Sequence, residues 1–217
     1  MDDEKGMVIN MKTVITIGRQ YGSGGREIGK KLAEDLGIPY YDKELLNRVA
    51  KDSGFCEEMI KSHDERPTNS FLYNIVMDTY SFGYNSAFVD MPMSQKVFLA
   101  QFDTIKKIAE EGPCVLVGRC ADYALADNDN CLNIFIYGQE DKKANRISAK
   151  YNVTVNEAKD MCRKRDKQRQ SYYNYYSTKK WGRADTYDLC IDSGILGVDG
   201  TVRFIKDYIR CYEEIER

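Results

Sequence analysis

The glycine-rich stretch within residues 13–36 constrains the fold of this chain more than any other feature. A β-branched run from Val14 to Ile17 leads into Gly18, and the chain then passes through the glycine-rich residues 22–25. Apolar residues follow at helical spacing, which predicts a strand, a loop and a helix in succession. Such a loop suits an anion, because several backbone N–H groups converge where the positive end of the helix dipole also points. The stretch therefore predicts a phosphate site.

The loop departs from the standard phosphate-binding signature, in which Lys and then Ser or Thr follow the last glycine. Here Gly24 is followed by Gly25, Arg26 and Glu27, so the usual ammonium and the usual magnesium ligand are both missing. The basic side chains that could replace the ammonium are Arg19, Arg26 and Lys30. The predicted phosphate-binding residues are Arg19, Gln20, Tyr21, Gly22, Ser23, Gly24, Gly25, Arg26 and Glu27. A glycine-rich run also forms plain tight turns, so both interpretations stay open for this motif alone.

Composition limits the classes of protein to consider. The 217 residues, 42% of them hydrophobic, suffice for one α/β domain, which we place at residues 12–217 after an extension at 1–11. A net charge of −2 gives no global attraction to nucleic acid or to an anionic membrane. Seven scattered cysteines without a CxxC pair indicate reduced thiols and a cytoplasmic location. The chain has no apolar run long enough for a membrane span, and its acidic N-terminus is unlike a signal peptide.

Apolar segments alternate with helical patterns along the chain. Further strands are predicted at residues 38–41, 114–117, 132–137 and 187–193. Continuously apolar strands separated by helices favour a parallel sheet of about five strands, covered on both faces. Ligands of such sheets bind beyond the carboxyl ends of the strands. The glycine loop, Asp42 and Arg119 each follow a predicted strand, so we expect them to converge there.

The helix predicted over residues 155–170 supplies an independent argument. Its apolar stripe, with residues spaced by three and four, leads at the same spacing to Arg165 and Arg169. Surface arginines commonly extend from the end of a core into solvent. Two inward arginines one turn apart also suit the oxygens of a transferring phosphoryl group. The candidate catalytic residues are therefore Arg165 and Arg169 of this helix, together with Arg26 of the glycine loop.

Four segments carry a family resemblance. They are GRQYGSGGREIGKKLAEDLGIPYYDKELLNRVA at residues 18–50, VGRCADYAL at 117–125, RDKQR at 165–169 and YDLCIDS at 187–193. Through them the chain resembles bacterial cytidylate kinases, and most closely the divergent cytidylate kinase-like family, which keeps a lysine-free loop. The resemblance implies the fold of P-loop NTPases, with a small helical nucleoside monophosphate-binding insertion at residues 55–93 and a lid at 163–185.

The resemblance also implies roles for individual residues. The acceptor-binding residues would be Asp42, Arg48 and Arg119, with Asp122 as a stand-in because Cys120 replaces the acid that follows Gly-Arg in the family. The lid arginines of the family would correspond to Arg165 and Arg169, reaching over the donor phosphates. The serine that follows the strand-end aspartate in the family is Lys43 here.

The reaction implied by the resemblance is transfer of the γ-phosphoryl group from ATP to a nucleoside monophosphate, with CMP or dCMP favoured. Phosphoryl transfer requires mainly positioning and charge neutralisation from the protein. We expect Mg²⁺ to accompany ATP and to be held by the nucleotide and waters, with no protein ligand assigned.

Two other functions remain open at this point. A non-catalytic nucleotide or anion sensor would explain why the loop lacks both Lys and Ser or Thr. A nucleic-acid-binding module is suggested by RKRDKQRQSYYNYYSTKKW at residues 163–181, where basic and aromatic residues interleave as in stacking platforms. The acidic remainder of the chain weakens that second alternative. The oligomeric state is not predicted.

Overall fold

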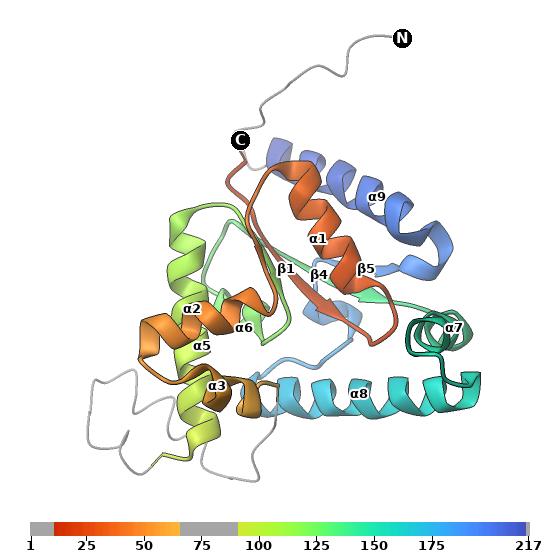
Figure 1. Cartoon of the computed structure of the whole chain (residues 1–217). Helices are drawn as coiled ribbons and strands as arrows, with labels where there is room; N and C mark the ends of the chain where they lie inside the picture. The colour runs from red at the N-terminus through yellow and green to blue at the C-terminus, as the bar shows by residue number, and fades with distance from the viewer. Residues whose placement is uncertain (1–10, 66–90, 216–217) are drawn as a thin grey trace.

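The computed structural model describes residues 11–65 and 91–215. It contains one sheet of five strands: β1 (Val14–Arg19), β2 (Tyr40–Tyr41), β3 (Val115–Val117), β4 (Cys131–Tyr137) and β5 (Leu189–Asp192). Their order is β2-β3-β1-β4-β5, and every neighbouring pair is parallel (Figure 1). The predicted five-stranded parallel sheet is therefore confirmed. Nearly all of the predicted extension, and residues 66–90 of the predicted insertion, lie outside the described residues.

Both faces of the sheet are apolar because both are covered. Along β1, Val14 packs into one core while Ile15 and Ile17 pack into the other. The side chains of successive strand residues point to opposite faces, so a strand buried on both sides must be continuously apolar. In register, Ile15 lies opposite Val115 of β3 and Leu132 of β4, which places β1 at the centre of the sheet.

Two helices cover one face of the sheet, α1 (Gly25–Leu36) and α9 (Ser193–Ile215), and they lie side by side (Figure 1). The other face is covered by α5 (Met93–Glu111) and the short α6 (Ala121–Ala124). Against α5 pack α2 (Glu44–Ser53) and α3 (Glu57–His63). The last helix divides at Gly197, whose φ of 67° interrupts the helical backbone. Among the described helices, none combines the length and the apolar character needed to cross a membrane.

A helical pair completes the described fold: α7 (Glu140–Tyr151) and α8 (Val155–Tyr176), followed by the 3₁₀ turn η2 (Ala184–Thr186). Figure 1 shows α8 as one long helix that runs from beside α7 toward α3 and α5. It continues beyond the predicted end at residue 170 because its last turns are buried. The ring of Tyr176 stacks on that of Phe98 in α5, with centroids 4.0 Å apart. Part of the predicted lid is thus an ordered helix, and its role as a lid stays a prediction.

Candidate active site

The glycine loop lies at the carboxyl end of β1, where the sequence predicts it. Gly22 and Gly24 have φ values of 82° and 81°, a left-handed conformation that glycine adopts without steric cost. The Ser23 hydroxyl donates to the Gln20 carbonyl oxygen at 2.8 Å, and Ile28 N donates to the Gly24 carbonyl oxygen at 2.9 Å. These bonds close the turn and start α1, so the loop meets the N-terminus of the helix.

Two charged residues that the sequence analysis did not identify contact the loop. They are Lys143 of α7 and Asp166 of α8. Asp166 Oδ1 accepts a hydrogen bond from Tyr21 N at 2.6 Å, and its Oδ2 lies 3.1 Å from Lys143 Nζ. The same Nζ donates to Gln20 Oε1 at 2.9 Å. A signal for Lys143 exists in the sequence: it lies in the first turn of the helix that follows β4, and that turn adjoins the carboxyl edge of the sheet.

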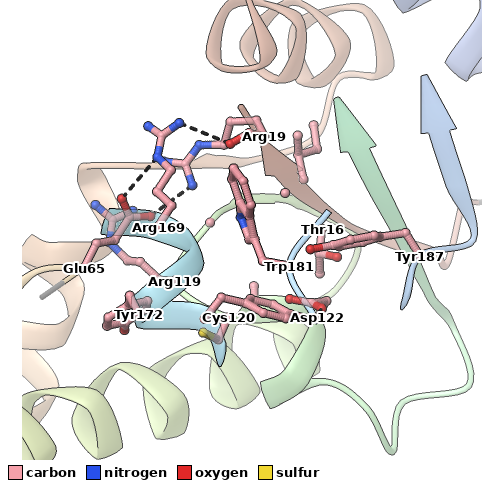
Figure 2. A pocket seen from close by; sticks show the side chains of 15 residues that line it. Thr16, Arg19, Glu65, Arg119, Cys120, Asp122, Arg169, Tyr172, Trp181 and Tyr187 are labelled. Atoms are coloured by element: carbon pink, nitrogen blue, oxygen red, sulfur yellow. Dashed lines mark hydrogen bonds and ion pairs between the residues drawn. The ribbon is translucent and has the colours of Figure 1, made fainter. Parts of the chain in front are cut away.

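Beside the loop, three arginines from separate segments gather around Glu65 (Figure 2). Arg19 Nη1 lies 3.0 Å from Glu65 Oε1, and Arg169 Nε lies 3.7 Å from Oε2. Arg169 also donates to the Arg19 carbonyl oxygen at 3.1 Å. Burial alone would raise the pKa of Glu65, but the charges of Arg19, Arg169 and Arg119 outweigh it and lower that pKa to about 2. We call these four residues the arginine cluster.

The backbone after β3 aims Arg119 into this cluster. Gly118, Arg119 and Cys120 have successive φ values of 79°, 55° and 54°. Left-handed backbone at a residue other than glycine costs on the order of 1 kcal/mol, so this turn is strained. Arg119 binds both carboxylate oxygens of Asp64 at 2.8 Å and donates to the Asp42 carbonyl oxygen at 2.8 Å. Burial lowers the pKa of Arg119, yet the nearby carboxylates, Asp64 foremost, produce a net rise, so Arg119 stays charged.

Asp42 connects the loop helix to the predicted acceptor side. Its Oδ2 lies 2.7 Å from Arg26 Nε, and its Oδ1 lies 3.5 Å from Arg119 Nη1. The charge of Asp42 raises the pKa of Arg26. Arg26 therefore contacts an acceptor-side residue, whereas Glu27 pairs with Arg146 of α7 at 2.8 Å. The structure thus brings together the predicted Arg19, Arg26, Asp42, Arg119 and Arg169.

Two predicted residues lie apart from this group. Arg48 pairs with Asp52 and with Glu111, the last residue of α5, and so lies toward the amino end of β3 rather than its carboxyl end. Arg165 is exposed and donates to Gln168 Oε1 at 3.3 Å. The expectation that the α8 stripe turns both arginines inward therefore holds for Arg169, which contacts Arg19 and Glu65, and fails for Arg165, whose hydrogen bond stays within its own helix.

Asp122 lies below the cluster in a narrow cavity. Its buried carboxylate accepts a hydrogen bond from the Tyr173 hydroxyl, and burial raises its pKa. The cavity measures about 20 Å³, space for about one water molecule. Figure 2 shows Trp181 and Tyr187 on the opposite side of this cavity from Arg119. In this conformation the floor of the site is packed and has no room for a nucleobase.

The aromatic residues of the proposed nucleic-acid platform are largely inside the protein. Tyr172, Tyr173 and Tyr176 are at most 5% exposed and pack with Phe98. Stacking on bases requires exposed ring faces. Three of the five aromatic residues that suggested this alternative are therefore buried and cannot stack on bases.

Carboxylates near the loop are already paired with basic side chains. Asp42 and Glu27 contact Arg26 and Arg146, and Asp166 contacts Lys143. Within residues 11–65 and 91–215, no group of three His, Cys, Asp or Glu side chains could hold a metal ion. The expectation that Mg²⁺ accompanies ATP and is held by the nucleotide and waters stays a prediction.

Comparisons with known proteins bear on the family and the fold of this chain. A cytidylate kinase from Methanothrix thermoacetophila is 24% identical over 200 residues, covering 91% of this chain and 98% of that protein. The structure of an uncharacterized protein from Eubacterium ventriosum is 35% identical, covers 92% of this chain and 99% of its own, and superposes with a TM-score of 0.69. A shikimate kinase from Bacteroides thetaiotaomicron shares the fold at a TM-score of 0.53 and 12% identity, covering 92% of this chain and 99% of its own. The pattern of the cytidylate kinase-like family matches residues 14–195, and the chain belongs to that family.

Proposed function

We propose that this protein transfers the γ-phosphoryl group of MgATP to a nucleoside monophosphate, with CMP or dCMP as the favoured acceptor. The observation that carries this proposal is the presence of two anion-binding devices at one edge of the sheet. The glycine loop offers backbone N–H groups at the N-terminus of α1, and the arginine cluster lies directly beside it. A reaction between two phosphate groups needs two such sites in contact.

Each part of the site has a place in the proposed reaction. The glycine loop and Arg19 would bind the donor phosphates, while Arg119, held through Asp42 and Asp64, would bind the acceptor phosphate. Arg169 contacts Arg19 and Glu65 and so lies where charge would develop during transfer. The acceptor is already an anionic phosphate, so no general base is required. Magnesium, entering with ATP, would neutralise charge on the transferring phosphates.

Two carboxylates, those of Glu65 and Asp64, already bind the arginines that the acceptor phosphate would contact. The Glu65 carboxylate occupies the position among the arginines that an anionic substrate would take, and Asp64 holds Arg119 in the same way. An arriving phosphate would have to displace these carboxylates. We infer that the end of α3 moves when the acceptor binds. A cytoplasmic location, suggested by the reduced cysteines, remains part of the proposal.

The test is a screen of the full chain with MgATP and each nucleoside monophosphate, with detection of diphosphate product. CMP or dCMP should give the fastest turnover. A bisubstrate analogue that joins adenosine to cytidine through phosphates should bind more tightly than ATP or CMP alone, because linkage makes the second binding event intramolecular.

A non-catalytic nucleotide sensor is the second candidate. It is favoured by the missing loop lysine and by the carboxylate partners of all three cluster arginines. The same screen separates the two functions. Calorimetry that finds a single nucleotide site, together with no diphosphate from any monophosphate, would replace the kinase with the sensor.

A further inference from the structure

Compared with the standard signature, this loop has a glycine where the lysine is expected and a basic residue where the first glycine is expected. In G-x-x-x-x-G-K the lysine follows the first glycine by six residues. With Gly24 as the last glycine, the lysine position is residue 25 and the first-glycine position is residue 19. This chain has Gly25 at the lysine position and Arg19 at the glycine position. The cation has moved along the sequence, and a glycine occupies the position that it left.

In the structure these two positions adjoin. A Cβ atom on Gly25 would lie 2.7 Å from Arg19 Cβ, closer than real Cβ contacts allow. A Cβ atom on Gly118 would lie 1.8 Å from Arg19 Nη1. The Arg19 side chain thus starts against one glycine and ends over another. Side chains larger than glycine at either position would obstruct its path.

Burial and charge also single out Arg19 among the replacements considered for the missing lysine. Arg19 is 9% exposed, and its guanidinium reaches Glu65 at 3.0 Å inside the arginine cluster. The Arg26 side chain is 55% exposed and pairs with Asp42. Lys30 is 66% exposed and pairs with Glu34 one helical turn away. The Arg19 guanidinium lies between the loop and Arg119, which is where the terminal phosphates of a donor would meet an acceptor.

We propose that Arg19 supplies the positive charge that the loop lysine supplies in standard phosphate-binding loops, and that it contacts the terminal phosphates of ATP. This inference rests on the proposed function, since it assumes that the donor is ATP. A planar guanidinium can bind two phosphate oxygens at once, which suits a position between two phosphoryl groups. Glu65 holds the guanidinium in the same place when no nucleotide is bound.

The test is a reciprocal exchange. Arg19→Gly should weaken ATP binding by about tenfold or more, as expected for loss of a charge-assisted contact. Gly25→Lys alone should also weaken it, because its Cβ would meet that of Arg19. The double variant Arg19→Gly/Gly25→Lys recreates the glycine and the lysine of the standard signature, and its ATP affinity should return to within about threefold of wild type. A merely structural role of Arg19 predicts that the two losses add and that no rescue occurs.

A second comparison keeps the inference testable if the double variant does not fold. Arg19→Met should reduce the ratio of ATP affinity to adenosine affinity, since adenosine has no phosphates, and Arg19→Lys should restore part of that ratio. Lys31→Met is the matched control, because Lys31 is exposed on α1 and pairs with Asp199 away from the loop. Circular dichroism and thermal melting check that each variant is folded.

The outcomes separate the two proposals. If the wild type binds ATP and Arg19→Met leaves the ATP-to-adenosine ratio unchanged, this inference is overturned while the proposed function stands. If the wild type binds no ATP, both are overturned. Rescue by the exchange, or loss of the ratio in Arg19→Met, supports the assignment of Arg19.

Discussion

The glycine loop and the arginine cluster differ in how they present positive charge to the anions that the proposed function requires. The loop is made by consecutive residues, and its donors are backbone N–H groups whose direction is set by left-handed glycines such as Gly22. The cluster is made by side chains from the end of β1, the turn after β3 and the middle of α8, joined by a carboxylate that follows α3. The loop is neutral when empty, whereas the cluster needs carboxylates such as Glu65 to compensate its charge.

Because of this difference, substitutions should destabilise the two regions for different reasons. A change in the loop acts through backbone geometry, while a change in the cluster leaves a buried charge without its partner. An unpartnered buried charge costs more than a strained φ angle. We therefore expect the larger effects in the cluster.

The largest effect is expected for Arg119→Ala. The Arg119 side chain is 3% exposed, and its loss leaves Asp64 without its bidentate partner. The free energy of unfolding should fall by about 3 kcal/mol, as for other broken buried ion pairs. Urea denaturation measures this. Arg183→Ala is the control, because its pair with Asp185 is 64% exposed and such pairs contribute under about 1 kcal/mol. Equal losses in the two variants would contradict the central place of Arg119.

Arg169→Ala should come next, with an effect on kcat. Burial and the neighbouring Arg19 lower the pKa of Arg169 to about 10, so it remains charged at neutral pH, as its role in the proposed reaction requires. We expect kcat to fall by about a hundredfold with little change in KM, in steady-state assays with MgATP and the best acceptor. Arg165→Ala is the matched comparison from the same helix. A smaller loss of kcat in Arg165→Ala would assign the catalytic effect to Arg169. Equal losses of kcat would argue for a lid that brings both arginines over the substrates.

Glycine-to-alanine substitutions compare the loop and the cluster through smaller expected losses of stability. Gly22, Gly37 and Gly118 all have positive φ, so alanine introduces similar strain at each, on the order of 1 kcal/mol. Around Gly37 nothing lies within 4 Å of the added Cβ, whereas at Gly22 it would lie 2.8 Å from the rigid Lys143 carbonyl oxygen. Thermal melts should therefore show Gly22→Ala as less stable than Gly37→Ala.

Gly118→Ala should behave differently from Gly22→Ala. Its added Cβ meets the ends of two side chains, Arg19 and Glu65, rather than a rigid backbone oxygen, so it should disturb their ion pair and make Gly118→Ala less stable than Gly37→Ala. The displaced guanidinium should also weaken ATP binding, measured by calorimetry. A large loss of stability without any change in ATP affinity would show that the cluster is as rigid as the loop.

The smallest effect at assay pH is expected for protonation of Glu65, because it develops only in acid. The pKa of Glu65 falls from 4.5 to about 2 on folding. Its ionised form therefore stabilises the folded state fully above about pH 4.5, and this contribution is lost as the pH falls toward 2. Urea denaturation across this range should show a shallower pH dependence for Glu65→Gln than for the wild type. Identical slopes would mean that Glu65 is solvated in the folded protein.

Local sequence patterns are sufficient to predict the strands, the glycine loop and the edge of the sheet that they share. A β-branched run before a glycine loop and a periodic helix is sufficient to place Gly22 and Gly24, since their conformations depend on near neighbours. Apolar strands separated by helices also bring Asp42 and Arg119 to the carboxyl edge, because parallel strands end together. These inferences use spacing within a few residues and one topological rule.

Which charged side chains pair with one another depends on tertiary packing. Periodicity marked Arg165 and Arg169 as equivalent, but Arg19 and Glu65 contact Arg169, which is half-buried, and leave Arg165 exposed. Arg48 is held away by Glu111, and the loop gains Lys143 and Asp166 from helices far along the chain. Charged side chains are long, and each has many partners of similar energy, so local sequence does not select among them. The selection is made by packing, which positions segments that are distant in sequence and leaves each buried charge with only one or two available partners.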